Sequence, residues 1–437
     1  MFSNNTRHGR SAKPTSMTTA TSARPIRVLV VGAGVGGISI ARGLLRDGHD
    51  VTVFERREAV RAGGGAVTIW SNGATVLDQL GVDMGGAGQL LSRLRVVTPT
   101  GRRLTSLDLA AMADRLGAPI RMVPRHVLLD RLLQGFPRER IRFNARAVAV
   151  DSTHDGVRVE FEDGSTAEGD VLVGADGLHS TVRNTVGAAH AESTGWCSWQ
   201  GLVTLPDIAD KRLALNIIGE CGNLGIWPAG GSELQWWFDL PWSSDFVRPQ
   251  YPLEMIRSHF TGWSDLVDRV LATLTDDDLA HSPYPHFRHP IPQPGHGLVT
   301  LLGDASHTMP PFLAQGTNQA LLDTMVLCKA LSDFRAEVNS GNDIARALRW
   351  YEKTRRRKVA AVSRLASMQV SRSEPVLRPM ALISDRLMTW ALTMFVRSVS
   401  HRRMSAEIRP HLGPLRAPNR VGGYAHTEQP APHELRA

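Results

Sequence analysis

Three glycines near the start of the chain, Gly32, Gly34 and Gly37, have the G-x-G-x-x-G spacing that can hold a pyrophosphate. The first permits a tight turn, the second lets backbone amides approach phosphate oxygens, and the third lets a helix pack closely on a strand. Glu55 lies farther along the chain, where its carboxylate could accept hydrogen bonds from a ribose. These residue types predict a site for FAD or NAD, because an acid at this place disfavours the 2′-phosphate of NADP.

The segments around these glycines predict the elements that such a site needs. Residues 26–31 are apolar and largely β-branched, which predicts a buried parallel strand. A helix is predicted next, and residues 50–54 predict a second strand that ends at Glu55. Phosphates would lie at the positive end of the helix dipole. A glycine-rich turn that only packs does not explain the acid.

Two later strands are also predicted to end in an acid. Residues 171–173 precede Asp176 in the stretch GADGLHSTVR, and residues 298–302 precede Asp304 in the stretch GDASHTMPP. Ligands of open α/β sheets bind at the carboxyl ends of parallel strands. A helix predicted to begin at 315–318 would offer free amides to an anion.

Other segments predict supporting structure. The glycine-rich stretch 62–69 indicates close approach to a bound ring or, equally, a flexible loop. Residues 94–107 predict a hairpin. Residues 122–134 predict a helix with Arg125 in its first turn, facing either the glycine region or solvent. Short antiparallel strands are predicted at 141–143, 145–151, 157–161 and 166–168.

A second, antiparallel lobe is predicted between residues 196 and 242, where six of the ten tryptophans lie in strand-like segments. Such aromatic clusters form either a core or the wall of a site for a stacked ligand. Prolines between 283 and 294 predict a stiff linker back to the first lobe. Long helices are predicted at 344–368 and 381–399.

Composition excludes several classes of protein. A chain of 437 residues predicts more than one lobe. Its three cysteines form neither a CxxC pair nor a metal-binding spacing, which favours a reducing, cytoplasmic location and no metal site. The net charge of +8 is concentrated in the first segment and at 355–358, which argues against nucleic acid as a partner. No apolar run is long enough for a membrane span.

The glycine motif, GADGLHSTVR and GDASHTMPP together resemble the class A flavoprotein monooxygenases, the p-hydroxybenzoate hydroxylase-like family, over residues 27–355. The resemblance implies an α/β fold, in which a Rossmann-like FAD-binding domain is interleaved with an antiparallel β-sheet substrate domain and followed by C-terminal helices. It also implies reduction by NADH or NADPH as a transient co-substrate. A flavin hydroperoxide would then deliver one oxygen atom from O2 to an aromatic or polycyclic small molecule.

The expected division of the chain follows these motifs. It comprises a disordered leader (1–24), a discontinuous FAD-binding domain (25–95, 120–190 and 284–340), a substrate-binding β-sheet domain (96–119 and 191–283), and C-terminal helices with a tail (341–437). The chain contains no second G-x-G-x-x-G strand–turn–helix unit, which suits a nicotinamide that visits the site. The expected oligomeric state is a monomer or a homodimer.

The resemblance implies a set of cofactor contacts at the matching motifs. They are Gly32, Gly34, Gly36, Gly37, Glu55, Arg56, Arg125, Asp176, Asp304, Gly316, Thr317 and Asn318. Arg183 is a hypothesis for the nicotinamide site. No catalytic side chain is assigned, because the flavin adduct is the oxidant. His307 is interpreted as a packing residue rather than a base.

Two departures from the family pattern bear on the flavin loop and on the substrate. Ala314 stands where many relatives have glycine, and Gln200 stands where aromatic-acid and urate hydroxylases often have the arginine of W-R-G. Loss of that arginine removes a partner for a carboxylate or urate, which favours a neutral or weakly acidic substrate. The candidate substrate contacts are Gln200, Trp227, Trp237, Pro311 and Phe312.

Aromatic hydroxylation is therefore the leading hypothesis. An epoxidase or Baeyer–Villiger oxygenase of secondary metabolism would use the same intermediate and is the main alternative. A flavin-dependent halogenase is disfavoured because no W-x-W-x-I-P stretch occurs. A flavin-binding protein without catalytic activity remains the non-enzyme alternative.

Overall fold

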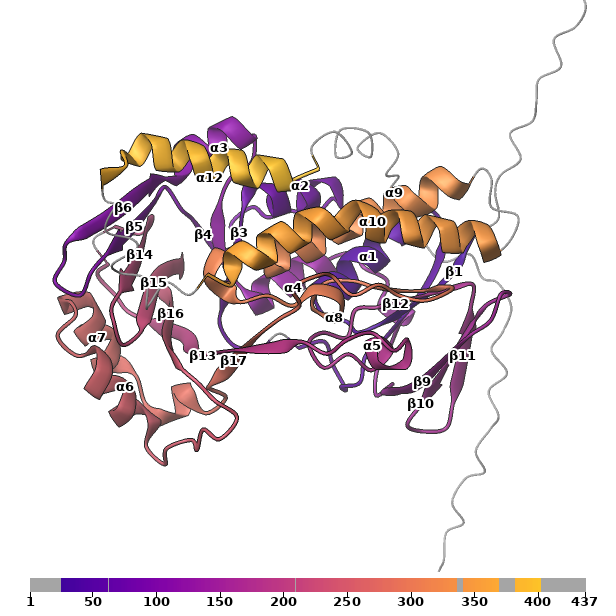
Figure 1. Cartoon of the computed structure of the whole chain (residues 1–437), viewed down its shortest axis with the longest axis horizontal. Coiled ribbons are helices and arrows are strands. Elements are labelled where there is room, and N and C mark those ends of the chain that lie inside the picture. Colours follow the sequence, from indigo (N-terminus) through magenta and orange to yellow (C-terminus); the bar gives the residue numbers. More distant parts are fainter. Residues whose placement is uncertain (1–24, 62, 209, 336–340, 369–381, 402–437) are drawn as a thin grey trace, which may run out of the picture.

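The computed structural model describes residues 25–61, 63–208, 210–335, 341–368 and 382–401, so the expected leader and most of the expected tail lie outside the described residues. Figure 1 shows a mainly antiparallel sheet on the left, a parallel sheet towards the right, and long helices from the end of the chain above them. The predicted fold class, a Rossmann-like parallel sheet with antiparallel sheets and C-terminal helices, is confirmed.

A five-stranded parallel sheet forms the framework for the three strand ends singled out above. Its spatial order is β18 (Val299–Leu301), β12 (Val171–Gly174), β1 (Arg27–Val31), β2 (Asp50–Phe54) and β8 (Ile141–Arg142). β18 and β12 are wholly buried, as continuous apolar runs predict for a parallel sheet. The prediction of an antiparallel strand at 141–143 is wrong, since β8 pairs in parallel with β2. A two-residue strand carries no pattern that identifies its partner.

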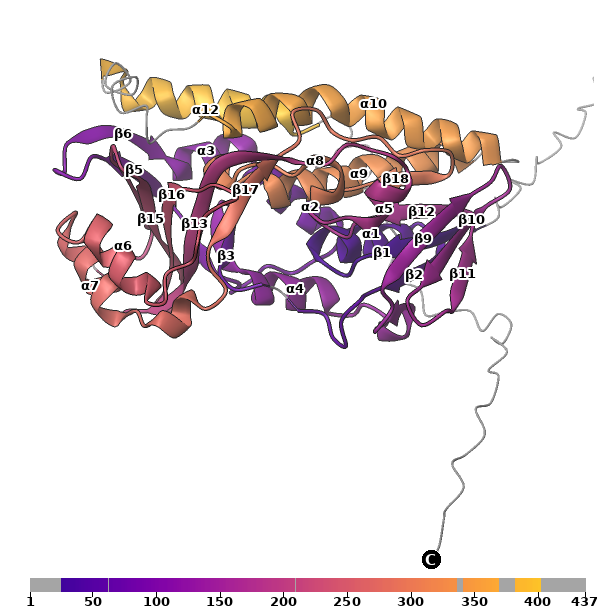
Figure 2. The same cartoon turned by 60° about the horizontal axis from the view of Figure 1, so that its bottom comes forward.

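Long helices cover this sheet. α1 (Val35–Arg46) packs on α9 (Gly316–Arg335), and α9 packs on α10 (Gly341–Ala366). Figure 2 shows α10 lying outside α9, with α12 (Asp385–Val399) continuing along the same side of the molecule. The three helices predicted in this part of the chain are confirmed, with ends that differ by a few residues. Within the described ranges, no helix is both long and apolar enough to cross a membrane.

Two three-stranded antiparallel sheets flank the parallel one. The first is formed by β9 (Ala147–Ser152), β10 (Val157–Phe161) and β11 (Thr166–Gly169), as predicted. The second is formed by β3 (Ala66–Ile69), β7 (Arg121–Pro124) and β4 (Gln89–Leu90). The helix predicted at 122–134 therefore begins later than expected, as α4 (Arg125–Leu133). Pro124 accounts for this, because the residue before a proline prefers extended backbone.

A seven-stranded sheet forms the wall opposite the parallel sheet. Its order is β17 (Tyr284–Arg288), β13 (Glu192–Thr204), β16 (Glu233–Pro241), β15 (Asn223–Gly230), β14 (Leu213–Ile218), β5 (Arg93–Val97) and β6 (Arg103–Asp108). β5 and β6 form the predicted hairpin. The prediction of a linker across 283–294 is wrong in part, because β17 forms there at the sheet edge, where proline is tolerated.

The two faces of this sheet differ in what they pack against. Trp199, Trp236 and Phe238 point to the outer face and form a core with α6 (Pro252–Phe260) and α7 (Asp265–Thr273). Alternate residues of the same strands, including Gln200 and Trp237, point to what we call the inner face. Of the six tryptophans in the predicted cluster, Trp199 and Trp236 are therefore core residues of the outer face.

Short elements complete the fold around these sheets. They are α2 (Ser71–Gln79), α3 (Leu109–Leu116), α5 (Thr181–Thr185), α8 (Asp304–His307) and 3-10 turns at Arg138–Arg140, Asp276–Leu279 and Pro311–Leu313. α12 is attached to β6 through Asp385, which accepts a hydrogen bond of 3.0 Å from the Ser106 backbone amide. The last described helix is thus tied to the seven-stranded sheet.

Candidate active site

The structure brings the three predicted strand ends together at one edge of the parallel sheet. Val31 is in register with Gly174, and Gly174 with Leu301, so β1, β12 and β18 end side by side. A Cβ atom built on Gly32 would overlap the carbonyl oxygen of Ala175, and one built on Gly36 would lie 2.7 Å from Leu302 Cδ2. The loops that carry the glycine motif, Asp176 and Asp304 are therefore neighbours.

The glycine turn leaves room for a ligand on one side only. Gly32 has φ +104°, a backbone conformation that favours glycine, and its amide donates to the Phe54 carbonyl oxygen at 2.8 Å. Gly34 faces open space: within the described residues, no atom lies within 4 Å of a Cβ built there. No side chain of the described chain caps α1, so its first amides can take an anion.

Glu55 is fixed beside this turn by backbone donors. Its Oε2 accepts a hydrogen bond from Ala33 at 3.0 Å, and its Oε1 accepts one from Arg57 at 3.0 Å. The carboxylate retains lone pairs for ribose hydroxyls, because each oxygen can accept more than one hydrogen bond. Arg56 is exposed next to it.

A buried charged network holds the loop that carries Asp304. Asp323 on α9 accepts hydrogen bonds from the Gly303 amide at 3.0 Å, from His307 Nε2 at 2.5 Å and from Arg355 Nε at 2.6 Å. Burial opposes ionisation of Asp323, but pairing with His307 and Arg355 outweighs it and lowers the pKa of Asp323 to about 2. His307 thus has a structural partner, in keeping with its interpretation as a packing residue.

Sequence reasoning missed Asp323 and Arg355, although a signal was present. Asp323 and Thr324 interrupt the apolar sequence of α9 between Leu322 and Met325. A charged residue on a buried helix face needs a partner, because an unpaired charge is costly to remove from water. That partner lies on α10, and the chain gives no local indication of it.

The start of α9 offers backbone amides rather than side chains. Asn318 is fully buried, and its side-chain Oδ1 accepts a hydrogen bond from the Trp70 backbone amide at 2.9 Å. Its Nδ2 donates to the carbonyl oxygens of Thr68 (2.9 Å) and Ala314 (2.9 Å). Its side chain is committed to the protein, which leaves the amides of Gly316, Thr317 and Asn318 as donors at the helix start. Gly316 faces Asp304, since a Cβ built on it would lie 4.0 Å from Asp304 Oδ1.

Arg125 supplies a cation whose side chain has no recorded hydrogen bond among the described residues. Its backbone amide donates to the Gly65 carbonyl oxygen at 3.0 Å, which places its backbone beside the glycine-rich stretch, the first of the two expected positions. Within the part of the chain that the structure describes, its guanidinium has no recorded hydrogen bond, and its Nε is buried without a partner. Removal from water lowers the pKa of Arg125, and the charges of Asp304 and Tyr284 oppose this shift in part. Such a group is suited to a ligand.

Asp176 and Arg183 serve mainly to shape the adjoining loop. Asp176 Oδ2 accepts hydrogen bonds from Thr181 at 2.8 Å and Val182 at 3.2 Å, at the start of α5. Its Oδ1 is buried without a partner among the described residues, and burial raises the pKa of Asp176. Arg183 is buried and donates to the carbonyl oxygens of Leu178 (2.7 Å) and Ala305 (3.2 Å), which joins the loops after β12 and β18.

The candidate substrate residues lie in two places, the inner face of the seven-stranded sheet and the turn before α9. Gln200, Trp227 and Trp237 lie on the inner face of the seven-stranded sheet, and the two indole rings are 5.7 Å apart. Trp227 Nε1 donates to Asn216 Oδ1 at 2.7 Å, so this ring is fixed. Pro311 and Phe312 are exposed in the turn that leads into α9.

Three polar side chains that the sequence did not single out meet on the same inner face. Ser198 Oγ hydrogen-bonds Asp239 Oδ1 and lies 2.7 Å from His286 Nε2. Removal from water raises the pKa of Asp239 to about 7 and lowers the pKa of His286 to about 4. A signal was available, since strand alternation over 233–241 places this acid on one face with Trp237.

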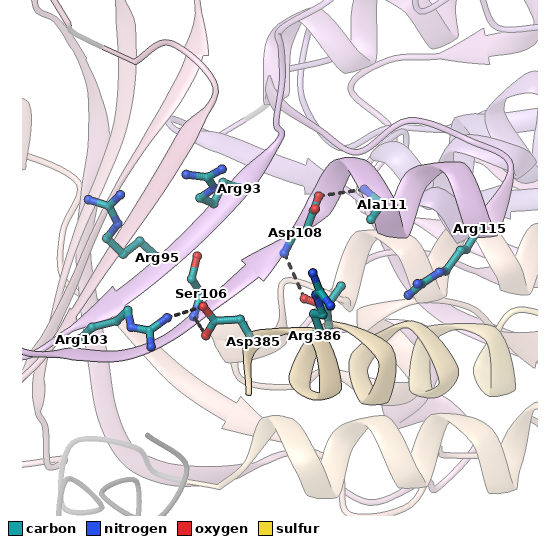
Figure 3. Close-up of a pocket in the computed structure, with 10 residues that line it drawn as sticks. Arg93, Arg95, Arg103, Ser106, Asp108, Ala111, Arg115, Asp385 and Arg386 are labelled. Atoms are coloured by element: carbon teal, nitrogen blue, oxygen red, sulfur yellow. Dashed lines mark hydrogen bonds and ion pairs between the residues drawn. The ribbon is translucent and has the colours of Figure 1, made fainter. Parts of the chain in front are cut away.

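A separate pocket of about 540 Å³ lies between β5, β6, α3 and α12 (Figure 3). Its charged lining consists of Arg93, Arg95, Arg103, Arg115, Arg386, Asp108 and Asp385. Arg103 forms an ion pair with Asp385, and Asp108 accepts a hydrogen bond from Ala111 at 2.9 Å. None of the predicted site residues lines this pocket, so it does not belong to the strand-end site.

These observations fit FAD. The space in front of Gly34, the uncapped start of α1 and the ordered Glu55 suit a pyrophosphate and a ribose. The first amides of α9 lie beside Asp304, where the rest of a dinucleotide would extend, and Arg125 has a buried Nε without a partner among the described residues. Within the described ranges, no group of His, Cys, Asp and Glu could hold a metal ion.

Comparison with known proteins agrees with this geometry. A model of the family described as "FAD binding domain" matches residues 25–366. An FAD-dependent urate hydroxylase of Klebsiella oxytoca is 32% identical over 76% of this chain and 86% of its own length. The 3-amino-4-hydroxybenzoate 2-monooxygenase PtnB3 of Streptomyces platensis is 31% identical over 80% of this chain and 88% of its own.

A solved structure shares both the fold and detectable sequence identity. It is an arginine-to-glutamine variant of HpxO from Klebsiella pneumoniae, complexed with FAD. It superposes with a TM-score of 0.75 at 26% identity, and the match covers 85% of this chain and 99% of that one.

Proposed function

This chain belongs to the FAD binding domain family, among the class A flavoprotein monooxygenases, and on that premise we propose that it hydroxylates a neutral or weakly acidic aromatic small molecule. It is an FAD-dependent monooxygenase, and reduction by NADH or NADPH is part of the proposal. FAD, when bound, supplies two-electron chemistry with NADH or NADPH and activation of O2. The protein's own residues bind, orient and exclude water.

One observation carries the proposal: the glycine-rich stretch joins the two parts of the site, since the Arg125 amide donates to the Gly65 carbonyl oxygen and the Ala66 amide donates to Gln235 of the seven-stranded sheet. Within the described chain the Arg125 guanidinium has no recorded hydrogen bond, and the charges of Asp304 and Tyr284 both act on it. Asp304 belongs to the strand-end site, and Tyr284 belongs to the seven-stranded sheet, in register with Ser198. On this proposal the cofactor end and the inner face of the sheet would meet at Arg125. A ligand at this junction would be in reach of both.

The proposed roles of the cofactor residues follow from their donors and acceptors. Gly34, Gly36 and the start of α1 would take the pyrophosphate, while Gly32 and Gly37 keep the turn tight. Glu55 would bind the adenosine ribose, with Arg56 beside it. Arg125, Asp304 and the amides of 316–318 would hold the flavin part. Asp176 would contribute through its unpartnered Oδ1.

The proposed substrate surface is the inner face with the turn before α9. Gln200, Trp227 and Trp237 would contact the flat faces and polar edge of a ring, and Pro311 and Phe312 would close the site against water. Two relatives are named for aromatic or heteroaromatic substrates, urate and an aminohydroxybenzoate. Gln200 carries no charge and cannot form an ion pair with a substrate carboxylate. This supports a substrate that has no carboxylate at this place.

The proposed division into domains follows the sheets. The parallel sheet and the β3–β7–β4 sheet would bind FAD, and the seven-stranded sheet would bind the substrate. The substrate-binding domain would begin at Arg93, where β5 starts, slightly before the boundary at residue 96 that the sequence predicts. A cytoplasmic location and a monomeric or homodimeric state complete the proposal.

The test is a screen of aromatic compounds for stimulation of NAD(P)H oxidation by the FAD-loaded enzyme. We expect at least one neutral phenol or heteroaromatic compound to stimulate oxidation and to gain one oxygen atom by mass spectrometry. The position of the new oxygen distinguishes a hydroxylated ring from an epoxide or a Baeyer–Villiger ester. Yellow protein that oxidises NAD(P)H with none of these compounds would contradict the proposal.

A further inference from the structure

The inner face carries an acid whose surroundings suit proton transfer. Asp239 lies opposite Ser198 in the register of β16 and β13, and Ser198 lies opposite Tyr284 in the register of β13 and β17. Residues directly opposite on antiparallel strands point to the same face. Trp237 and Gln200 follow two residues away on the same two strands. The acid therefore shares a face with the proposed substrate contacts.

The hydrogen bonds of this group leave one oxygen of Asp239 available. Ser198 has one hydroxyl proton and donates it to Asp239 Oδ1, so neutral His286 can donate from Nε2 to Ser198 Oγ. Among the described residues, Asp239 Oδ2 has no recorded partner. Asp239 keeps limited access to solvent, whereas Ser198 is buried. The hydrogen-bonded series His286–Ser198–Asp239 thus holds Asp239 Oδ1 in place and leaves Asp239 Oδ2 available to a substrate.

We propose that the Asp239 carboxylate is the general base that removes a proton from a substrate hydroxyl or ring N–H, and that Ser198 and His286 are its positioning residues. The substrate O–H or N–H bond breaks, its electron pair stays on the substrate, and the proton moves to Asp239 Oδ2. The substrate class is therefore a phenol, an enol or an N–H heteroaromatic compound. This inference rests on the proposed function and names the substrate class of the same site.

The chemical purpose is to make the ring richer in electrons. Aromatic rings react faster with an electrophilic oxygen after they have lost an acidic proton. A general base is most effective when its pKa lies near the pH at which the enzyme works. This role also fits the replacement of arginine by Gln200, because a neutral substrate needs a base more than a counter-ion.

The ionisable groups around Asp239 do not supply an alternative cation. His286 and Tyr284 share its face, and Cys197 points to the opposite face of β13. Burial raises the pKa of Cys197 to about 12, so the thiol stays protonated. Burial also keeps His286 neutral at pH 7. Asp239 is thus the group of this set that changes charge near neutral pH.

The first test needs no substrate. Infrared difference spectra of the FAD-loaded enzyme across the pH range should show a carboxyl group that titrates near pH 7 in the wild type and is missing in Asp239→Asn. Asp245→Asn, at an exposed carboxylate, is the matched control and should leave the band unchanged. Absence of the band in the wild type, or its persistence in Asp239→Asn, overturns the assignment.

The second test separates the base from the proposed function. The probes are phenols and their O-methyl ethers, compared by NAD(P)H oxidation. We expect phenols to stimulate and the ethers to fail, and Asp239→Asn to lower kcat about 100-fold with FAD content unchanged. Ser198→Ala should move the acid limb of the pH profile upward, because its hydroxyl lowers the pKa of Asp239.

Each other outcome has a defined meaning. If ethers and phenols stimulate equally and Asp239→Asn keeps its rate, the base is refuted while the monooxygenase stands. If no aromatic probe stimulates oxidation, the proposed function fails, and with it the substrate class inferred here. An unshifted pH profile in Ser198→Ala removes Ser198 from the positioning role.

Discussion

Gly37 packs so closely on Gly32 that a Cβ atom built on Gly37 would overlap the Gly32 carbonyl oxygen. Gly34, between them, faces open space. Two glycines of one motif thus have different physical roles, one in packing helix against strand and one in leaving room for a ligand. Substitutions at these positions should separate folding from cofactor binding.

Gly34→Val should fold normally and lose FAD. Its φ of −73° suits any residue, and the new side chain would occupy only the space proposed for the pyrophosphate. We expect wild-type unfolding behaviour with little bound flavin, measured by absorbance per protein. Gly37→Ala is the contrast, since its Cβ meets backbone and the protein should lose stability. A fully flavinylated Gly34→Val protein would contradict the phosphate site.

Asp304→Ala should weaken FAD binding without weakening the fold. Asp304 is exposed and has no recorded hydrogen bond within the described chain, so its removal leaves no protein group unpaired. Hydrogen bonds to charged groups contribute about 1.5–3 kcal/mol, which corresponds to a roughly 10- to 100-fold higher Kd for FAD. Fluorescence titration of the flavin-free protein measures this, with Asp245→Ala as control. Equal affinities would exclude Asp304 from the site.

Ala314→Gly should stabilise the protein. Ala314 has φ +48° and ψ +37°, the left-handed conformation that glycine adopts without penalty. Relief of this strain is worth roughly 1 kcal/mol, reduced in part by the larger entropy of glycine in the unfolded chain. Urea unfolding at a fixed FAD concentration tests it. A lower unfolding free energy would mean that the alanine methyl group contributes packing that outweighs the strain.

Asp323→Asn should be strongly destabilising. Breaking a buried ion pair from one side leaves Arg355 uncompensated, which costs about 3–5 kcal/mol of unfolding free energy. The same urea experiment measures the loss, and Asp245→Asn serves as the surface control. A change no larger than that of the control would show that the network contributes little.

The Asp323 carboxylate also predicts that the free energy of unfolding decreases at low pH. The folded-state pKa of Asp323 lies at about 2, below its ordinary value of 3.8, so its contribution is present above that ordinary value. This contribution to the free energy of unfolding is lost as the pH falls from 3.8 through about 2, because in that range the unfolded chain binds a proton at Asp323 more readily than the folded protein does. Asp323→Asn should flatten this part of the pH–stability curve, and an unchanged curve would refute it.

Several features were determined by the sequence alone. The glycine spacing, the acid at residue 55 and the two acid-ended strands specify local backbone geometry, and local geometry is what a chain encodes in neighbouring residues. The fold class was implied by the family resemblance that these motifs carry, and the sheets confirm it. Boundaries were less certain: Pro124 moved the start of α4, and β8 took a parallel partner because two residues carry no information about pairing.

Only the tertiary structure decided which distant side chains meet. Asp323 finds His307 and Arg355 from another loop and another helix, and Asp239 finds Ser198 and His286 from two other strands. It also committed Asn318 to the backbone around Trp70. Burial and pairing set the charge of these groups, and both depend on contacts between residues far apart in the chain, which composition and periodicity do not contain.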